Sequence, residues 1–157
     1  MDLPQTGRCQ CGAVAYALDA EPVTVYACHC HGCQHQSSSA FGISAIVPRA
    51  AVRFTAGTPA EWHRTTASGR AQVCYHCADC GSRLLHWHVD APNASLKPGT
   101  LDDARWVRPV AHIFTESAQP WTEPLRNSAP SFPRGPDDMK ALAQAWASRD
   151  RSEESGS

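Results

Sequence analysis

The feature that most constrains this chain is the stretch from Cys28 to Cys33, where three thiols fall close together. Cys28, Cys30 and Cys33 lie too near one another in sequence for each to fill a separate place in a core. A disulfide between positions i and i+2 is poorly aligned, whereas a short loop can turn all three sulfurs toward one ion. Zinc is the expected metal, because soft thiolates in tetrahedral geometry suit it.

The identity of the fourth ligand decides what such a site does. A protein side chain in that position would close the site and make it structural, whereas solvent or substrate would make it chemical. The candidate side chains are seven histidines: His29 and His31 in the loop, and His35, His76, His86, His88 and His112 elsewhere in the chain. We expect the fourth position to be exchangeable.

A second set of thiols is formed by two close pairs, each followed directly by a glycine. Such a glycine permits the tight turn that aims backbone N–H groups at the sulfurs. Together the pairs supply four thiolates, which predicts a closed, structural zinc site that links the start of the chain to its later strands. The four residues are Cys9, Cys11, Cys77 and Cys80.

The eighth cysteine, Cys74, also forms a CxxC pattern with Cys77. We favour Cys80 as the ligand because Gly81 follows it, whereas Cys74 falls within a predicted strand. A free cysteine often behaves as a small buried apolar residue, and this is the interpretation we adopt for Cys74, although ligation stays possible.

Length and net charge limit the number of domains and the kinds of partner. The chain has 157 residues and a formal net charge of −1, which predicts one domain over residues 1–148 with a polar flexible tail at 149–157, and no nucleic-acid or membrane partner. No apolar run reaches the length of a membrane span, and the first residues lack a secretory signal. We therefore expect a cytoplasmic protein whose thiols bind metal rather than form disulfides. The oligomeric state is open.

Short β segments separated by turns dominate the pattern. A helix is predicted only near the end, over residues 137–147, where Leu142 and Trp146 share a face with Met139 and Ala143. The fold class is therefore mainly β with a C-terminal helix. The expected strands cover residues 13–18, 23–27, 41–47, 52–54, 61–66, 70–76, 83–89 and 110–116.

The ordered combination of these motifs resembles a known family. Residues 7–16 (GRCQCGAVAY), residues 28–33 (CHCHGC) and residues 77–82 (CADCGS), followed by residues 99–103 (GTLDD), are similar to the glutathione-dependent formaldehyde-activating enzymes, a family that includes centromere protein V-like proteins. Two stretches depart from the family pattern: Gln34 to Ser39 stands where basic residues and a Ser-Gly pair are common, and His76 replaces an aromatic residue.

The resemblance implies an Mss4-like β-tent of antiparallel sheets. It also implies a structural zinc at Cys9, Cys11, Cys77 and Cys80, and a functional zinc with an exchangeable fourth ligand at Cys28, Cys30 and Cys33. The implied activity is that of an S-(hydroxymethyl)glutathione synthase, a carbon–sulfur lyase that joins the thiol of glutathione to formaldehyde.

Three hypotheses follow for the function. The first is a zinc-dependent lyase or synthase acting on a glutathione-like thiol and a small aldehyde, with Cys28, Cys30 and Cys33 as the catalytic ligands. The second is a carrier that binds glutathione or another thiol without turnover. The third is a structural or interaction module in which both zinc sites are closed.

Overall fold

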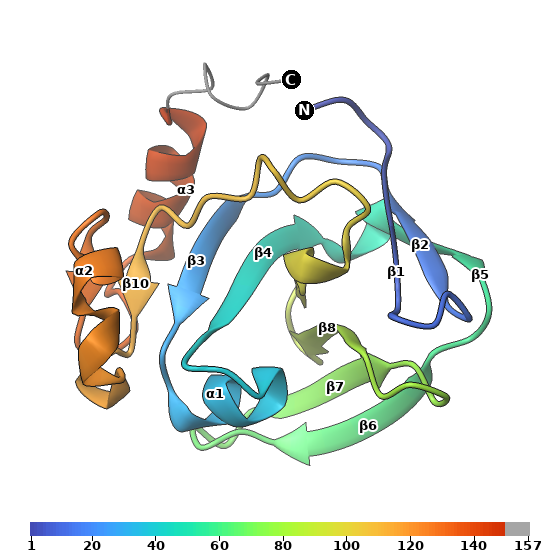
Figure 1. Cartoon of the computed structure of the whole chain (residues 1–157), viewed down its shortest axis with the longest axis horizontal. Coiled ribbons are helices and arrows are strands. Elements are labelled where there is room, and N and C mark those ends of the chain that lie inside the picture. The colour runs from blue at the N-terminus through green and yellow to red at the C-terminus, as the bar shows by residue number, and fades with distance from the viewer. Residues whose placement is uncertain (150–157) are drawn as a thin grey trace. The chain divides into compact units, whose positions relative to one another are not determined.

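Short β-strands make up most of the chain in the computed structural model, which describes residues 1–149 (Figure 1). Eleven strands and three short α-helices lie within these residues. The prediction of a mainly-β protein with a helix near its C-terminal end is confirmed, and the strand content is consistent with a β-tent. The predicted polar tail, apart from Arg149, lies outside the described residues. No helix within residues 1–149 is long and apolar enough to cross a membrane.

The chain divides into two compact units, each built from separate stretches of sequence. The first unit comprises Met1–Pro22 and Ile46–Trp106, and the second comprises Val23–Ala45 and the chain from Val107 onward. A single domain over residues 1–148 therefore stays a prediction.

The first unit contains two antiparallel arrays of strands. One has the order β1-β2-β5, and the other has the order β9-β8-β7-β6, in which the last three lie side by side in Figure 1. These strands are β1 (Gln5–Arg8), β2 (Ala15–Leu18), β5 (Val52–Ala56), β6 (Ala60–Thr65), β7 (Ala71–His76), β8 (Arg83–His88) and β9 (Asn93–Leu96).

Tyr16 anchors the core of this unit. Its side chain is fully buried, and its hydroxyl lies 2.8 Å from Oγ1 of Thr100. Leu18, which follows it on the same face of β2, is also fully buried. Gly57, in the turn between β5 and β6, has a φ of +65°, and a Cβ there would meet the carbonyl oxygen of Ala13. Only glycine fits that close approach.

The second unit contains strands in the order β11-β10-β3-β4, in which β10 runs parallel to both of its neighbours. The antiparallel pattern expected from the sequence is therefore mixed here. The elements are β3 (Thr24–Cys28), α1 (His31–Ser37), β4 (Gly42–Pro48), which continues into the first unit, β10 (His112–Ile113), α2 (Glu123–Arg126), β11 (Ser131–Phe132) and α3 (Met139–Ala147).

Helix α3 packs alongside β3 (Figure 1). It begins after Asp138, whose carboxylate accepts a hydrogen bond from the Lys140 N–H and so caps the helix. Leu142 and Trp146 are buried as predicted, and the Thr24 hydroxyl donates to the Leu142 carbonyl at 3.0 Å. Met139 on the same predicted face stays largely exposed.

Two differences from the predicted elements have a local cause. The strand expected over residues 110–116 is reduced to His112–Ile113, because Phe114 adopts a left-handed conformation with φ 56° and a 3₁₀ turn follows. The helix α1 was not predicted, since none of its residues is buried and it therefore shows no apolar periodicity. The short strands β1, β9 and β11 were also missed.

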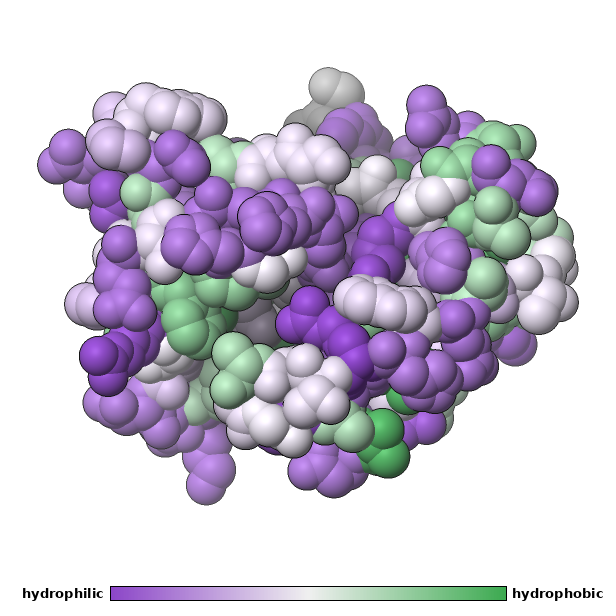
Figure 2. Space-filling view, turned by 90° about the horizontal axis from the view of Figure 1, so that it is seen from below, coloured by the Kyte–Doolittle hydropathy of each residue, from purple (hydrophilic) through white to green (hydrophobic). Residues whose placement is uncertain are grey.

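Apolar side chains form small groups on the face drawn in Figure 2, separated by polar residues. The largest exposed apolar side chains are spread along the sequence: Leu3, Val23, Trp62, Val89, Trp121, Leu125 and Met139. Single exposed apolar side chains are normal on a folded protein and need no functional explanation.

Candidate metal centre

Four sulfurs of the first unit converge at the ends of its strands. The Sγ atoms of Cys9, Cys11, Cys77 and Cys80 all lie within 4.8 Å of one another. The Cys9 and Cys11 sulfurs are 3.5 Å apart, and those of Cys11 and Cys77 are 3.7 Å apart. Cys9 and Cys77 are buried, whereas Cys11 is exposed.

Both cysteine pairs sit in turns that end on a glycine with positive φ, as the sequence pattern predicted. Gly12 has φ 80° and donates its N–H to the Cys9 carbonyl at 3.0 Å, and Gly81 has φ 71° and donates to the Cys77 carbonyl at 3.0 Å. The turn also aims the Val14 N–H at the Cys9 sulfur, 3.3 Å away. This geometry brings four soft donors close together, and four thiolates are a donor set that structural zinc uses.

Neighbouring N–H groups, a hydroxyl and the sulfurs themselves set the pKa values of these thiols. The Val14 N–H lowers the pKa of Cys9, and the Ser82 hydroxyl lowers that of Cys80 to about 5. For Cys11, a hydrogen bond from the Ala13 N–H lowers the pKa, but the sulfurs of Cys9, Cys80 and Cys77 outweigh it and raise the pKa to about 12. Four adjacent thiolates repel one another, so full ionisation of the set needs a positive ion among them.

Three sulfurs of the second unit form the other cluster. The Sγ atoms of Cys28, Cys30 and Cys33 lie within 4.8 Å of one another. Strand β3 ends at Cys28, Cys30 occupies the N-cap position of α1, and Cys33 lies in the first turn of that helix. The Cys30 carbonyl accepts from the N–H groups of Cys33 and Gln34 at 2.9 and 3.0 Å, which fixes the turn that gathers the sulfurs.

Sulfur neighbours and backbone N–H groups set the charge of this cluster. The thiols of Cys28 and Cys33, with the N–H groups of Cys33 and Gly32, lower the pKa of Cys30. The Cys30 and Cys33 sulfurs in turn raise the pKa of Cys28, and the Cys30 N–H partly opposes that rise. The cluster by itself therefore favours one thiolate, and ionisation of all three sulfurs requires a cation.

No fourth histidine, cysteine or carboxylate of the described second unit joins these three sulfurs. His29, inside the loop, is fully buried and its Nε2 lies 2.9 Å from Nδ1 of His112. Burial first, and then the charges of His112 and Arg126, lower the pKa of His29 to about 4. His31 and His35 lie on α1 and are exposed.

Two other residues, Ser37 and Cys74, have local roles. The Ser37 hydroxyl contacts the carbonyl oxygens of Cys33, Gln34 and Phe41, so it satisfies the end of α1 rather than facing a ligand. Cys74 belongs to neither cluster; it is fully buried in β7, 3.6 Å from Oε1 of Gln72.

Gln34 was not predicted from the sequence; its side chain holds the cysteine loop in place by hydrogen bonds. Its amide donates to the carbonyls of His29 and Ser117 at 2.6 and 2.8 Å, and its oxygen accepts from Gln119 at 3.2 Å. Ser117 and Gln119 are remote from Gln34 in sequence, and no local pattern marks these contacts.

Both clusters can hold a metal ion, and their all-sulfur donor sets suit zinc. The four-sulfur set would be closed by protein ligands alone. The three-sulfur set would leave one tetrahedral position to another ligand, which is the arrangement of catalytic rather than structural sites.

Comparisons with known proteins bear on the fold and on the segment that carries the cysteines. The crystal structure of a Rhodobacter sphaeroides protein is similar in fold, with a TM-score of 0.50 and 16% sequence identity over 81% of this chain and 98% of that chain. No curated protein matches the sequence. A family described as glutathione-dependent formaldehyde-activating enzyme matches residues 4–117, which carry all eight cysteines. The match spans well over half of the chain, and the protein therefore belongs to the glutathione-dependent formaldehyde-activating enzyme family.

Proposed function

We propose that this protein is a zinc-dependent carbon–sulfur lyase or synthase that joins a glutathione-like thiol to a small aldehyde such as formaldehyde. The observation that carries the proposal is the trio of Cys28, Cys30 and Cys33, whose sulfurs meet without a fourth ligand from the described second unit. A second zinc ion, held by the four sulfurs of the first unit, would be structural.

The reaction adds a thiol across a carbonyl group. The sulfur attacks the carbonyl carbon, a carbon–sulfur bond forms, and the proton of the thiol ends on the former carbonyl oxygen. A thiolate is the reactive form, and a bound zinc ion would supply a position for the thiol and lower its pKa.

The backbone of the chain stabilises the negative charge of the sulfurs. Three thiolates exceed the charge of Zn²⁺ by one before any substrate thiolate enters. The N–H groups of Gly32 and Cys33 point at the Cys30 sulfur, and the Cys30 N–H points at that of Cys28. Such fixed donors offset the excess charge without having to reorganise during the reaction.

Gln34 supports the proposal by holding the loop rigid. Both N–H groups of its amide are used, one for the His29 carbonyl and one for the Ser117 carbonyl. Since His29 lies between two of the proposed ligands and Gln34 directly follows the third, the contact keeps the sulfurs at fixed spacing. A reaction between two bound partners requires that the ligands be held at fixed positions.

A shallow cavity of about 560 Å³ beside α1 offers room for the body of a substrate. It includes Gln34, His35, Ser38, Ser39 and the exposed ring of Trp121, and no acidic residue lines it. Amide, hydroxyl and aromatic groups of this kind suit a short peptide that carries carboxylates, such as glutathione.

The test combines metal analysis with a kinetic assay. Zinc content is measured for the wild type and for Cys30→Ser, and the interconversion of formaldehyde, glutathione and S-(hydroxymethyl)glutathione is followed by ¹³C exchange NMR. We expect two zinc ions per wild-type chain and one in Cys30→Ser, with exchange faster than the spontaneous rate only in the wild type.

Cys74→Ser is the matched control, because Cys74 is a buried cysteine outside both clusters. It should keep both zinc ions and the full activity. Acceleration that persists in Cys30→Ser after one zinc is lost would overturn the proposal, as would a wild type that binds a single ion.

A second candidate function is a carrier that binds the thiol without turnover. The all-thiolate donor set favours it, because three anionic sulfurs make zinc a weak Lewis acid toward an aldehyde oxygen. Calorimetry with glutathione separates the two: binding that depends on Cys30, together with an exchange rate equal to the spontaneous one, identifies the carrier.

A further inference from the structure

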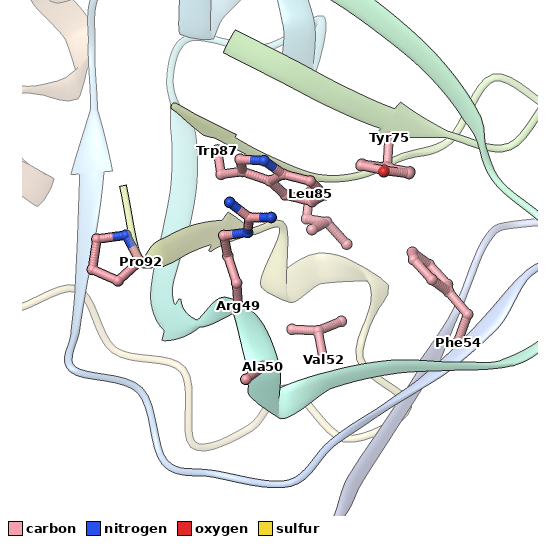
Figure 3. A pocket seen from close by; sticks show the side chains of 8 residues that line it. All are labelled: Arg49, Ala50, Val52, Phe54, Tyr75, Leu85, Trp87 and Pro92. Atoms are coloured by element: carbon pink, nitrogen blue, oxygen red, sulfur yellow. The ribbon is translucent and has the colours of Figure 1, made fainter. Parts of the chain in front are cut away.

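A separate cavity of about 460 Å³ lies within the first unit, beside a 3₁₀ turn at Arg49–Ala51 and strands β5, β7 and β8. Figure 3 shows Arg49 toward one end and Phe54 at the other, with Val52 on one side and Leu85 and Tyr75 on the opposite side. Its size is within the usual range for small-molecule sites. None of the eight cysteines lines it.

The pairing of strands creates an aromatic wall on one side of this cavity. In the β7–β8 register Tyr75 faces Leu85 and Val73 faces Trp87, so Tyr75 and Trp87 are diagonal neighbours on one face. Their rings stack with centroids 4.7 Å apart and an interplanar angle of 28°. Phe54 extends the wall, 5.9 Å from the Tyr75 ring.

The aromatic wall is held in place from outside the cavity. The Tyr75 hydroxyl donates to the Glu61 carboxylate at 2.6 Å, across the β6–β7 pair. Glu61 also accepts from His63 and does not line the cavity. The ring of Tyr75 is therefore fixed, and its polar end is already satisfied.

Arg49 brings a positive charge to this apolar surface. Its guanidinium carbon lies 4.5 Å from the centroid of the Trp87 ring, and its backbone N–H donates to the Pro92 carbonyl at 3.0 Å. Within residues 1–149 no carboxylate pairs with the guanidinium. Stacking occupies one face of the guanidinium and leaves its in-plane N–H donors able to form a two-point contact.

We propose that this cavity binds an aromatic carboxylate. The carboxylate would pair with the Arg49 guanidinium, whose planar fork matches it, and the ring of the ligand would lie toward Phe54, between Val52 and the Tyr75–Leu85 side. The cation and the apolar wall together select a molecule with both features, because an anion without a ring gains no burial and a ring without a charge leaves the guanidinium without a partner.

The probes are 2-naphthoate, its neutral relative 2-naphthylmethanol, and acetate, each titrated into the zinc-loaded protein and followed by calorimetry and by the indole N–H signals in NMR. We expect 2-naphthoate to bind about tenfold or more tightly than either of the others. The Trp87 indole signal, assigned by Trp87→Phe, should shift on binding. Equal affinity for 2-naphthoate and 2-naphthylmethanol would overturn the proposal without any variant.

Arg49→Gln should weaken 2-naphthoate binding about tenfold or more and leave 2-naphthylmethanol binding unchanged. Arg53→Gln is the matched control: it removes the same charge from a nearby exposed arginine that pairs with Asp19 at 3.5 Å and does not line the cavity. It should bind 2-naphthoate as the wild type does. Equal losses in the two variants would mean that only net charge matters and would overturn the assignment.

Discussion

His29 and His112 form a buried hydrogen bond, Nε2 to Nδ1 at 2.9 Å, that joins the cysteine loop to strand β10. One of these two nitrogens carries the proton and the other accepts it, since a neutral imidazole has one donor and one acceptor nitrogen. Burial lowers the pKa of both imidazoles, which keeps the pair neutral.

The first prediction removes one partner of that bond. In His112→Leu the Nε2 atom of His29 stays buried without a partner, so we expect the free energy of unfolding of the zinc-loaded protein to fall by about 1–3 kcal/mol. Urea unfolding followed by circular dichroism measures it. His63→Leu is the control, since the His63 side chain is 67% exposed and its loss should change stability by less than about 0.5 kcal/mol. Equal effects would show that the buried bond contributes nothing.

The second prediction separates the two cysteine clusters by their effect on stability. Cys77 lies in the set that connects residues 9–12 to residues 77–81, so we expect Cys77→Ser to lose one zinc ion and about 3 kcal/mol or more of stability. Cys33→Ser should also lose one zinc ion, with a smaller loss of stability, because its cluster spans only a short loop. Thermal unfolding with zinc analysis compares them. A larger loss in Cys33→Ser would reverse the proposed structural and exchangeable roles.

The third prediction concerns Gly57. Alanine at this position combines a positive φ with a clash between its Cβ and the Ala13 carbonyl, so we expect Gly57→Ala to cost about 2–4 kcal/mol. Two other glycines separate the cost of the positive φ from the cost of the clash. Gly69→Ala, with φ +81° and open space, should cost about 1 kcal/mol, and Gly99→Ala, with neither constraint, should be neutral. Denaturant unfolding of the three variants would refute this account if Gly57→Ala were no worse than Gly69→Ala.

The turns, strands and helix that could be predicted are encoded by residues close together in the sequence. The spacing of the cysteines, together with Gly12 and Gly81, predicted the two similar turns that carry the four thiols. This was possible because each turn and its sulfur atoms lie within a few residues of sequence. Most strands and the helix α3 followed from the period of their apolar residues. The same reasoning failed for α1, because this helix buries none of its residues and so shows no apolar face.

Contacts between remote segments could not be predicted. His29 and His112 are 83 residues apart, and they meet only because β3 and β10 pair in parallel, with Ala27 opposite His112. The cavity beside Arg49 likewise depends on the β7–β8 register, since a shift of one residue would turn Tyr75 and Trp87 to opposite faces. Register is set by packing of the whole array, which a linear pattern does not reveal.

The last prediction concerns alkaline pH. Tyr16 has its pKa raised from 10.0 to about 12 by burial, with a smaller contribution from Asp102, while the hydrogen bond with Thr100 opposes the rise. Because the folded pKa exceeds the unfolded one, the neutral phenol stabilises the fold fully below pH 10, and this contribution is lost as the pH rises toward 12. The loss approaches about 3 kcal/mol.

Tyr16→Phe has no proton to lose, so its stability should decline less steeply than that of the wild type between pH 10 and pH 12, although the variant also lacks the hydrogen bond to Thr100. Urea unfolding at several pH values in this window measures the slope. Tyr75→Phe is the comparison: burial and Glu61 also raise the pKa of Tyr75 to about 12, but its ring is only half-buried and water screens its charge, so its removal should change the slope less. Parallel slopes for Tyr16→Phe and the wild type would mean that the phenol of Tyr16 ionises in the folded protein as easily as in the unfolded chain.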